Sequence, residues 1–226
     1  MARPRTFDED QVVCAARDQF WATGYTATSL DDLTAATGLG RGSLYGAFGD
    51  KHALFLRALD RYCDEAAAAI RADLRAAGSP FERLAGHVHA MVAIIVGDVE
   101  RRGCLMAKSA AELAGTDPEV AQRVNRVLTE AHALLTECVS EAQRAGELAA
   151  GHDPARLAGL VLVVLRGLET VGACGAPPSM IRDAAEQVLA LLPRPADAAD
   201  TTDAADTTDL SDTSARHYRP LMREVG

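Results

Sequence analysis

The side chains that could support redox or metal chemistry in this chain are five cysteines and two closely spaced histidines. The cysteines are far apart, odd in number and without a Cys-x-x-Cys pair, which is typical of reduced thiols in a cytosolic protein rather than of a disulfide framework. Oxidation of Cys104 or Cys138 as a signal is kept as an alternative, although nothing in the sequence marks either thiol as reactive. His87 and His89 stand two residues apart on an expected helix and therefore do not share a face. We expect no metal site and no cofactor.

A glycine-rich segment from Gly38 to Gly42 could at first suggest a loop that cradles phosphate. No predicted strand precedes it, and its glycines do not have the G-x-G-x-x-G spacing of such loops. The chain also shows no arrangement of a nucleophile with a general base. We therefore expect neither a nucleotide site nor catalytic residues, and the protein is predicted not to be an enzyme.

The same glycines fit better as turn residues between two short helices. Thr28 and Asp31 have the spacing of a capping box, which predicts that a helix starts here. The first glycine ends that helix, because glycine adopts the left-handed conformation at no steric cost. A second helix is predicted from about Arg41 to Phe48, with Leu44 and Phe48 on its buried side. This is the spacing of a helix-turn-helix, whose second helix is free to enter a DNA major groove.

Residues 3–62 closely resemble the N-terminal domain of the TetR family of transcriptional repressors, in its AcrR-type branch. The resemblance extends over about sixty residues without a gap. It implies an N-terminal three-helix domain that binds DNA, and it says almost nothing about the effector. The positions that carry the resemblance are Phe20, Gly24, Tyr25, Thr28, Asp32, Gly38, Ser43, Leu44, Tyr45, Phe48, Lys51 and Leu54.

The resemblance also implies which side chains contact DNA. Arg41 and Ser43 would lie at the exposed start of the second helix, where an arginine can contact guanine O6 and N7 together. Tyr45 and Thr28 would each place a hydroxyl on a phosphate, and Lys51 would combine a cationic head with the backbone N–H groups of a helix start. A basic arm around Pro4 would reach an adjacent groove or phosphates, or is an ordinary chain terminus. The expected DNA-binding residues are Thr28, Arg41, Gly42, Ser43, Tyr45, Lys51, Arg3 and Arg5.

The charge of the chain argues against a general, sequence-blind binder of polyanions. The formal net charge is −9 and the pI is about 5.1, and residues 1–51 hold five basic and seven acidic side chains, a net charge of −2. A weak basic footprint predicts few phosphate contacts and a shallow salt dependence. Gly46 and Ala47 are small where many relatives carry a second aromatic residue or a histidine. A helical dimer with weakened or lost DNA binding, acting as an interaction protein, is therefore kept as an alternative.

The rest of the chain is predicted to be helical, which gives an all-α fold with about nine helices. Alanine and leucine are abundant, and no stretch combines β-branched alternation with turn pairs. We expect a helix-turn-helix domain over residues 1–50, an effector-binding and dimerisation domain over 51–192, and a disordered acidic tail over 193–226. After the first domain, the expected helices cover residues 51–77, 79–100, 102–114, 118–145, 154–172 and 178–192.

The helical domain is expected to bind a small hydrophobic effector and to form a homodimer. The segment 154–174 is nearly apolar all round, which suggests a subunit interface. In the family the last two helices form a four-helix bundle with their symmetry mates, so dimerisation through 154–174 and 178–192 is implied. An apolar pocket is expected between the helices around 79–100, 102–114, 118–145 and 154–174. Its candidate walls are Met91, Ile95, Met106, Leu134, Cys138 and Leu165.

The tail contains six aspartates and no basic residue between Asp197 and Asp212, so it cannot bury a core. No signal peptide is recognised, and the longest apolar runs are too short to span a bilayer, so we expect a cytoplasmic protein without a membrane partner. The sequence thus predicts a ligand-responsive repressor that a small effector releases from a near-palindromic operator in double-stranded DNA.

Overall fold

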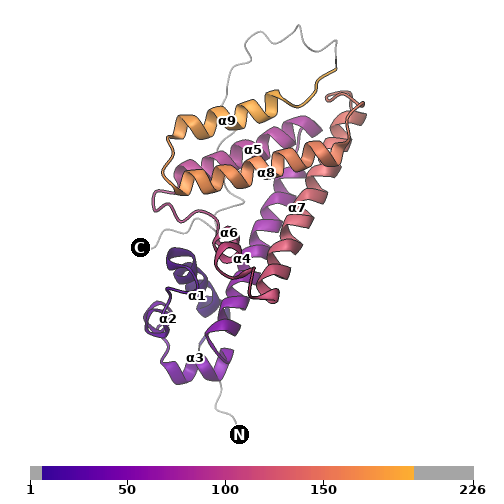
Figure 1. Ribbon diagram of the computed structural model, residues 1–226. Helices are drawn as coiled ribbons and strands as arrows, with labels where there is room; N and C mark the ends of the chain where they lie inside the picture. Colours follow the sequence, from indigo (N-terminus) through magenta and orange to yellow (C-terminus); the bar gives the residue numbers. More distant parts are fainter. Residues whose placement is uncertain (1–6, 196–226) are drawn as a thin grey trace. The chain divides into compact units, whose positions relative to one another are not determined.

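The computed structural model describes residues 7–195, and this part of the chain folds into nine α-helices without a β-strand (Figure 1). The all-α fold predicted from the sequence is confirmed. The predicted tail and the Arg3/Arg5 arm lie outside the described residues. The helices are α1 (Glu9–Thr23), α2 (Leu30–Thr37), α3 (Arg41–Phe48), α4 (Lys51–Leu74), α5 (Pro80–Gly97), α6 (Leu105–Leu113), α7 (Pro118–Arg144), α8 (Pro154–Ala173) and α9 (Pro178–Ala190).

Packing divides the described chain into two compact units. The N-terminal unit comprises residues 7–64 and 104–125, and the C-terminal unit comprises residues 65–103 and 126–195. The first part of α4, all of α6 and the beginning of α7 therefore pack with the helix-turn-helix. This division by packing differs from the division by function at residue 50, which stays a prediction.

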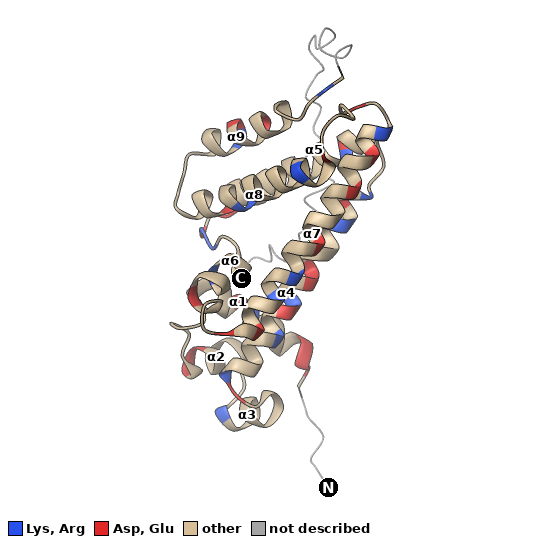
Figure 2. Cartoon of the chain, turned by 45° about the vertical axis from the view of Figure 1, so that its right-hand side comes forward, with Lys and Arg blue, Asp and Glu red and all other residues tan. Residues whose placement is uncertain are grey.

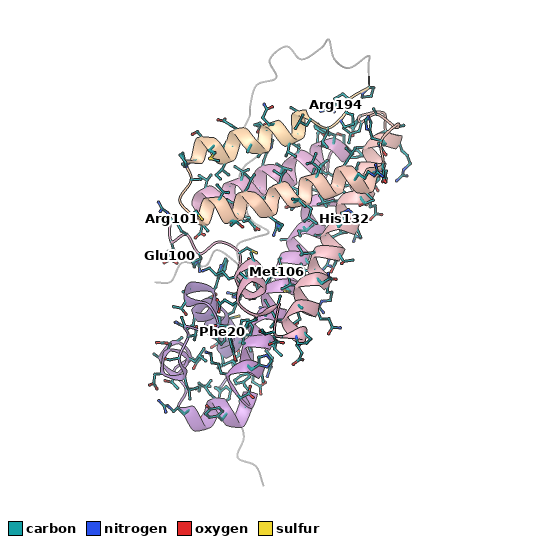
Figure 3. All side chains as sticks on the ribbon, in the orientation of Figure 1. Phe20, Glu100, Arg101, Met106, His132 and Arg194 are labelled. Atoms are coloured by element: carbon teal, nitrogen blue, oxygen red, sulfur yellow. The ribbon has the colours of Figure 1, made fainter. Side chains whose placement is uncertain are left out.

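The core of the N-terminal unit is built from aromatic rings and leucines. Phe20 on α1 is fully buried and meets the ring of Phe55 on α4 edge-on, with 5.1 Å between the ring centroids (Figure 3). Tyr25 packs against Phe55 at 4.7 Å, and Leu33 of α2 is fully buried. Offset and edge-on aromatic pairs of this kind add to the stabilisation from burial. They fix α1 and α2 against the start of α4.

The start of α2 differs from the sequence prediction by one residue. Ser29, not Thr28, is the N-cap, and its hydroxyl and the Asp32 carboxylate bond each other's backbone N–H groups as a capping box. The sequence holds two overlapping matches to the capping pattern, and the Thr28 hydroxyl instead donates to the Gly24 carbonyl at 2.5 Å. The predicted helix end is confirmed, since Gly38 adopts the left-handed conformation with a φ of 67°.

In the C-terminal unit α5, α8 and α9 lie side by side (Figure 1). Their buried faces meet through apolar side chains, among them Leu84, Leu165 and Ile181, each at most 1% exposed. The predicted capping box of Ser79 and Glu82 at the start of α5 is present. No helix among residues 7–195 has the length and hydrophobicity needed to cross a bilayer.

Polar contacts join α4, α5 and α7 within the C-terminal unit. The buried pair His87 and Asp73 joins α5 to α4, with 3.0 Å between Nδ1 and Oδ2. Arg83 donates to the Leu74 carbonyl at 3.0 Å and pairs with Glu141. Each contact closes a distance of at least nine residues along the chain, so these bonds set the positions of helices relative to one another within the unit.

Candidate nucleic-acid interface

Helix α3 has one buried and one exposed face, as the sequence predicts. Leu44 and Phe48 are 3% and 6% exposed and anchor the helix in the N-terminal unit. The opposite face is open to solvent, and Tyr45 on it is 49% exposed, so its ring and hydroxyl are accessible to a partner. The exposed residues of α3 are Arg41, Gly42, Ser43, Tyr45 and Gly46. A short helix with hydrogen-bond donors along a free face fits a groove of DNA.

Arg41 is already engaged in an ion pair with α2. Its Nη2 lies 2.5 Å from Asp31 Oδ1, and the two side chains are 61% and 74% exposed. The hydrogen bond that Arg41 donates to the Asp31 carboxylate raises the pKa of the Arg41 guanidinium, a group that is cationic at neutral pH. The sequence predicted Arg41 in the interface but indicated no role for Asp31 beyond a helix cap.

Thr28 supports the turn between α1 and α2. Its side chain is 1% exposed, its hydroxyl donates to the Gly24 carbonyl, and it shares a 2.7 Å hydrogen bond with the Thr23 hydroxyl. In the free protein this hydroxyl therefore has internal partners, and the phosphate contact expected for Thr28 stays a prediction.

The side chain of Lys51, the first residue of α4, lies over an aromatic ring. Its Nζ lies 4.4 Å from the centroid of the Tyr25 ring, a cation–π arrangement. Partial burial lowers the pKa of Lys51, while the carboxylates of Glu112 and Asp32 oppose that shift. Asp50 caps the same helix by accepting from Ala53 N at 2.7 Å. This cap was not predicted from the sequence, and it puts a negative charge beside the lysine expected to bind phosphate.

Helix α6 holds the junction of α1 and α2 through two charged residues one turn apart. Lys108 Nζ donates to the Trp21 carbonyl near the end of α1 at 2.8 Å. Glu112 Oε2 accepts from Thr26 N at 2.9 Å. A cation thus meets the carbonyl end of a helix and an anion meets backbone N–H, which matches the charges of those groups. From the sequence alone this i, i+4 pair would be assigned to a solvated surface.

Gly24 explains how Glu112 comes so close. Its φ and ψ are 82° and 168°, a conformation that is open almost only to glycine. A Cβ at this position would clash with Glu112 Oε1. The positive φ and the close approach both require glycine, so this residue fixes where α6 lies in the N-terminal unit.

The start of α4 is also tied to the start of α7. His52 Nε2 lies 2.6 Å from Asp117 Oδ2, while Asp117 Oδ1 accepts from Glu119 N at 3.0 Å. The hydrogen bond with His52 lowers the pKa of Asp117. Asp117 therefore caps α7 and at the same time holds the residue next to Lys51.

The expected effector pocket is not gathered in one compact unit. Met106 belongs to α6 in the N-terminal unit (Figure 3), whereas the other five expected wall residues lie in the C-terminal unit. Ile95 packs on Gly172 so closely that a Cβ there would clash with Ile95 Cγ2. Met91 and Leu165 are 4% and 0% exposed. These positions are consistent with core packing, and their contact with a ligand stays a prediction.

The cysteines form no disulfide in the described chain, and their environments differ. Burial raises the pKa of the Cys138 thiol to about 11, so its reactive thiolate form is suppressed at neutral pH. Cys104 is 5% exposed and accepts a hydrogen bond from the Tyr62 hydroxyl at 3.7 Å. Cys174 is the exposed thiol. Of the two thiols considered for oxidation, neither is open to solvent.

Among the described residues no group of three or more histidine, cysteine or acidic side chains is placed to hold a metal ion. His87 pairs with Asp73, and His89 lies 2.9 Å from Glu186 on the surface. The two histidines therefore have different partners on different sides of α5.

Comparison with known proteins gives two family matches and several relatives. Residues 13–58 match the family described as bacterial regulatory proteins, tetR family, and residues 80–190 match the tetracyclin repressor-like, C-terminal domain. The HTH-type transcriptional repressor ComR of Escherichia coli K12 is 30% identical over 192 residues, which cover 84% of this chain and 91% of the relative.

A solved structure of the TetR family transcriptional regulator CifR, a cysteine mutant in complex with 26-bp double-strand operator DNA, is 34% identical with a TM-score of 0.73. The match covers 84% of this chain and all of that one. The reduced form of NemR from E. coli has a TM-score of 0.75 at 17% identity and covers 83% of this chain and 97% of that one, which supports the fold alone.

Proposed function

Because this chain belongs to the TetR family of bacterial regulatory proteins and is a DNA-binding transcriptional regulator, we propose that it is a dimeric repressor that a small effector releases from its operator. The observation that carries the proposal is the exposed face of α3. It presents Arg41, Ser43 and Tyr45 to solvent while Leu44 and Phe48 hold the helix in the core. Relatives include a named repressor and a regulator solved with operator DNA, which supports the same role.

On DNA, we infer that α3 enters the major groove and that the start of α4 contacts the backbone. Arg41 and Ser43 face base edges, and Tyr45 and Lys51 face phosphates. The Tyr25 ring holds Lys51 before DNA arrives, since the ammonium lies 4.4 Å from the ring centroid. Few basic groups lie on this face, so the interface depends on well-placed contacts more than on a strong positive field.

The proposed dimer forms through α8 and α9. Leu160 and Val163 are 42% and 69% exposed in the single chain, and with Gly167 and Thr170 they recur at intervals of three, four and three along α8. This is the spacing of a seam between two packed helices, and the glycine allows close approach. Met180 on α9 and Leu191 directly after it are 54% and 69% exposed. In Figure 2 few residues of α8 are coloured as charged, in contrast to α4 and α7. A two-fold axis would pair this face with itself.

Effector response is proposed from the construction of the chain. Two of the helices that reach the N-terminal unit, α4 and α7, continue into the C-terminal unit without a break. An effector that binds the C-terminal unit and favours one placement of these helices shifts DNA affinity by its difference in affinity for the two states. The effector itself is proposed only as a small apolar molecule, because the interior of the C-terminal unit is lined by small and apolar side chains.

The first test is a gel shift of the full chain on the DNA upstream of its own gene, with nonspecific competitor. We expect a shifted species that survives competitor, and we expect the Tyr45→Ala/Lys51→Ala double variant to weaken binding on all sequences. Losing the one cationic phosphate contact of Lys51 in each subunit lowers the salt slope by about two for a dimer. Arg75→Ala serves as the control, because it removes one exposed cation directly after α4, outside both the proposed DNA interface and the proposed dimer interface.

Two results would contradict the proposal. One is unchanged binding by the double variant, which would remove α3 and the start of α4 from the interface. The other is failure of the wild-type chain to enrich any sequence from a random duplex library at low salt. That outcome would favour the alternative of a helical dimer that has lost DNA binding.

A further inference from the structure

The ion pair of Asp31 and Arg41 joins the two helices of the helix-turn-helix on their exposed side. Arg41 Nη2 and Asp31 Oδ1 are 2.5 Å apart, and both side chains are more than half exposed. Ion pairs this exposed contribute little to folding stability. The position of the pair is more informative, since Arg41 is the first residue of the helix proposed to enter the groove.

We propose that Asp31 is a specificity-determining residue of the DNA interface, which holds the Arg41 guanidinium in the orientation that reads one base pair. This inference rests on the proposed function. A guanidinium has five N–H donors, and the bond to Asp31 occupies one of them. Four donors remain, and two of them suffice for the O6 and N7 atoms of a guanine, so the same arginine can bond the carboxylate and the base together.

The arrangement reduces the cost of ordering a long side chain. An unrestrained arginine loses rotamer freedom when it binds a base, and a partner that fixes it beforehand removes part of that loss. Asp31 suits this task because its side chain is short and it sits in the first turn of α2, where the helix dipole favours a carboxylate. The capping box of Ser29 and Asp32 holds that turn in place.

A carboxylate at this surface could instead act only as a competitor of DNA. In that case Asp31 would repel phosphates and occupy Arg41 until DNA displaces it. The two roles give opposite results on removal of the charge. A positioning residue is needed for discrimination between bases, whereas a competitor affects all sequences alike and its removal raises affinity without changing base preference.

The experiment begins with selection of a preferred duplex by the full-length wild-type chain from a library of 30-bp duplexes with a randomised centre. Dissociation constants are then measured at one salt concentration for that duplex and for every single base-pair change in it. The proteins compared are wild type, Asp31→Asn, Arg41→Ala and the Asp31→Asn/Arg41→Ala double variant. Asp10→Asn is the matched control, because it removes the same charge from the first turn of α1. Thermal unfolding of each variant shows that it is folded.

We expect Arg41→Ala to abolish a preference of roughly 5- to 150-fold at one base pair. Asp31→Asn should reduce the preference at that same base pair about 2- to 10-fold and leave the other positions unchanged. In the Arg41→Ala background, Asp31→Asn should no longer affect the preference at that base pair, and it should raise the affinity for all duplexes. Asp10→Asn should keep the wild-type preference.

Three outcomes overturn the inference. Asp31→Asn could keep the full preference at the base pair that depends on Arg41, which would make Asp31 a competitor only. Arg41→Ala could leave all preferences intact, which would mean that no base is read by this pair. A wild-type chain that selects no duplex refutes the proposed function itself, and it is recognised because it precedes any comparison of variants.

Discussion

Replacement of Gly24 by alanine tests the account of how α6 is fixed against the helix-turn-helix. Two separate penalties are expected. Gly24 has a φ of 82° and a ψ of 168°, and holding a residue with a Cβ there costs about 1–3 kcal/mol. The added Cβ would also displace the Glu112 carboxylate from its 2.9 Å hydrogen bond with Thr26 N. A bond to a charged group is worth about 1.5 kcal/mol, and this site is exposed, so we take about 1 kcal/mol for it.

The predicted loss for Gly24→Ala is therefore about 2–4 kcal/mol in the free energy of unfolding. The two penalties separate in a double-mutant cycle with Glu112→Ala. Without the carboxylate there is nothing to displace, so Gly24→Ala should then cost only the backbone strain, and the coupling between the two sites should be about 1 kcal/mol.

The assay is guanidinium denaturation of the full chain at one protein concentration, followed by fluorescence. Trp21 is the only tryptophan, is 6% exposed and lies in the N-terminal unit, so its emission reports on this unit. Gly38→Ala, in the same unit, is a control with a φ of 67° and open space around the Cβ, for which only strain is expected. Gly46→Ala, within α3 and also in open space, should stabilise by about 0.5–1 kcal/mol.

The account of the junction is refuted if Gly24→Ala has an equal effect with and without Glu112, because the clash would then not involve that carboxylate. It is also refuted if the substitution changes the free energy of unfolding by less than about 0.5 kcal/mol, since the backbone could then not be in the conformation seen here.

Three further predictions follow from other parts of the structure. Val163→Glu should convert the dimer to a monomer in light scattering, because it places a charge in the α8 seam. The control Val99→Glu, in an exposed turn, should leave the dimer intact. If the Val163→Glu variant is also a dimer, the seam on α8 is excluded. Because the pKa of Asp117 is lowered in the folded state, its carboxylate should contribute stability that is present above about pH 4 and lost as the pH falls through its folded pKa. The difference in unfolding free energy between wild type and Asp117→Asn should therefore shrink below about pH 4. A difference that is constant with pH would contradict the bond to His52. Iodoacetamide at pH 7.5 should label the exposed Cys174 well before Cys138, whose pKa is about 11, and mass spectrometry follows the labelling. Equal rates of labelling would mean that Cys138 is not buried.

The sequence predicted local features well because local rules decide them. The helical period placed Leu44 and Phe48 on the buried side of α3, and the position of Gly38 marked the end of α2. The capping prediction was wrong by one residue because Thr28 and Ser29 both fit the pattern. A bond from Thr28 to the Gly24 carbonyl decided between them, and this bond depends on the turn before the helix.

Contacts between residues far apart in the chain could not be predicted from the sequence. The bond between Thr26 and Glu112 spans 86 residues, and no pattern in a single chain indicates such a pairing. The residues expected to line the pocket fall in two packing units, which the sequence could not indicate for a related reason. Met106 has the spacing of a core residue, but periodicity tells only that a residue is buried and not which helix buries it.

The location of α6 bears on how the proposed effector response reaches the helix-turn-helix. Residues 80–190 match the tetracyclin repressor-like C-terminal domain, yet α6, within that range, packs in the N-terminal unit and bonds the end of α1 through Lys108. The described chain passes between the units at three places, after residues 64, 103 and 125. Two of these lie inside α4 and α7, which cross between the units as unbroken helices. The third lies in the turn before α6, where Arg101 has a φ of 54° and Gly103 a φ of 64°. We infer that a ligand in the C-terminal unit would act on the junction of α1 and α2 through these three connections, and the turn is the one that leads directly into α6, whose Lys108 bonds the Trp21 carbonyl.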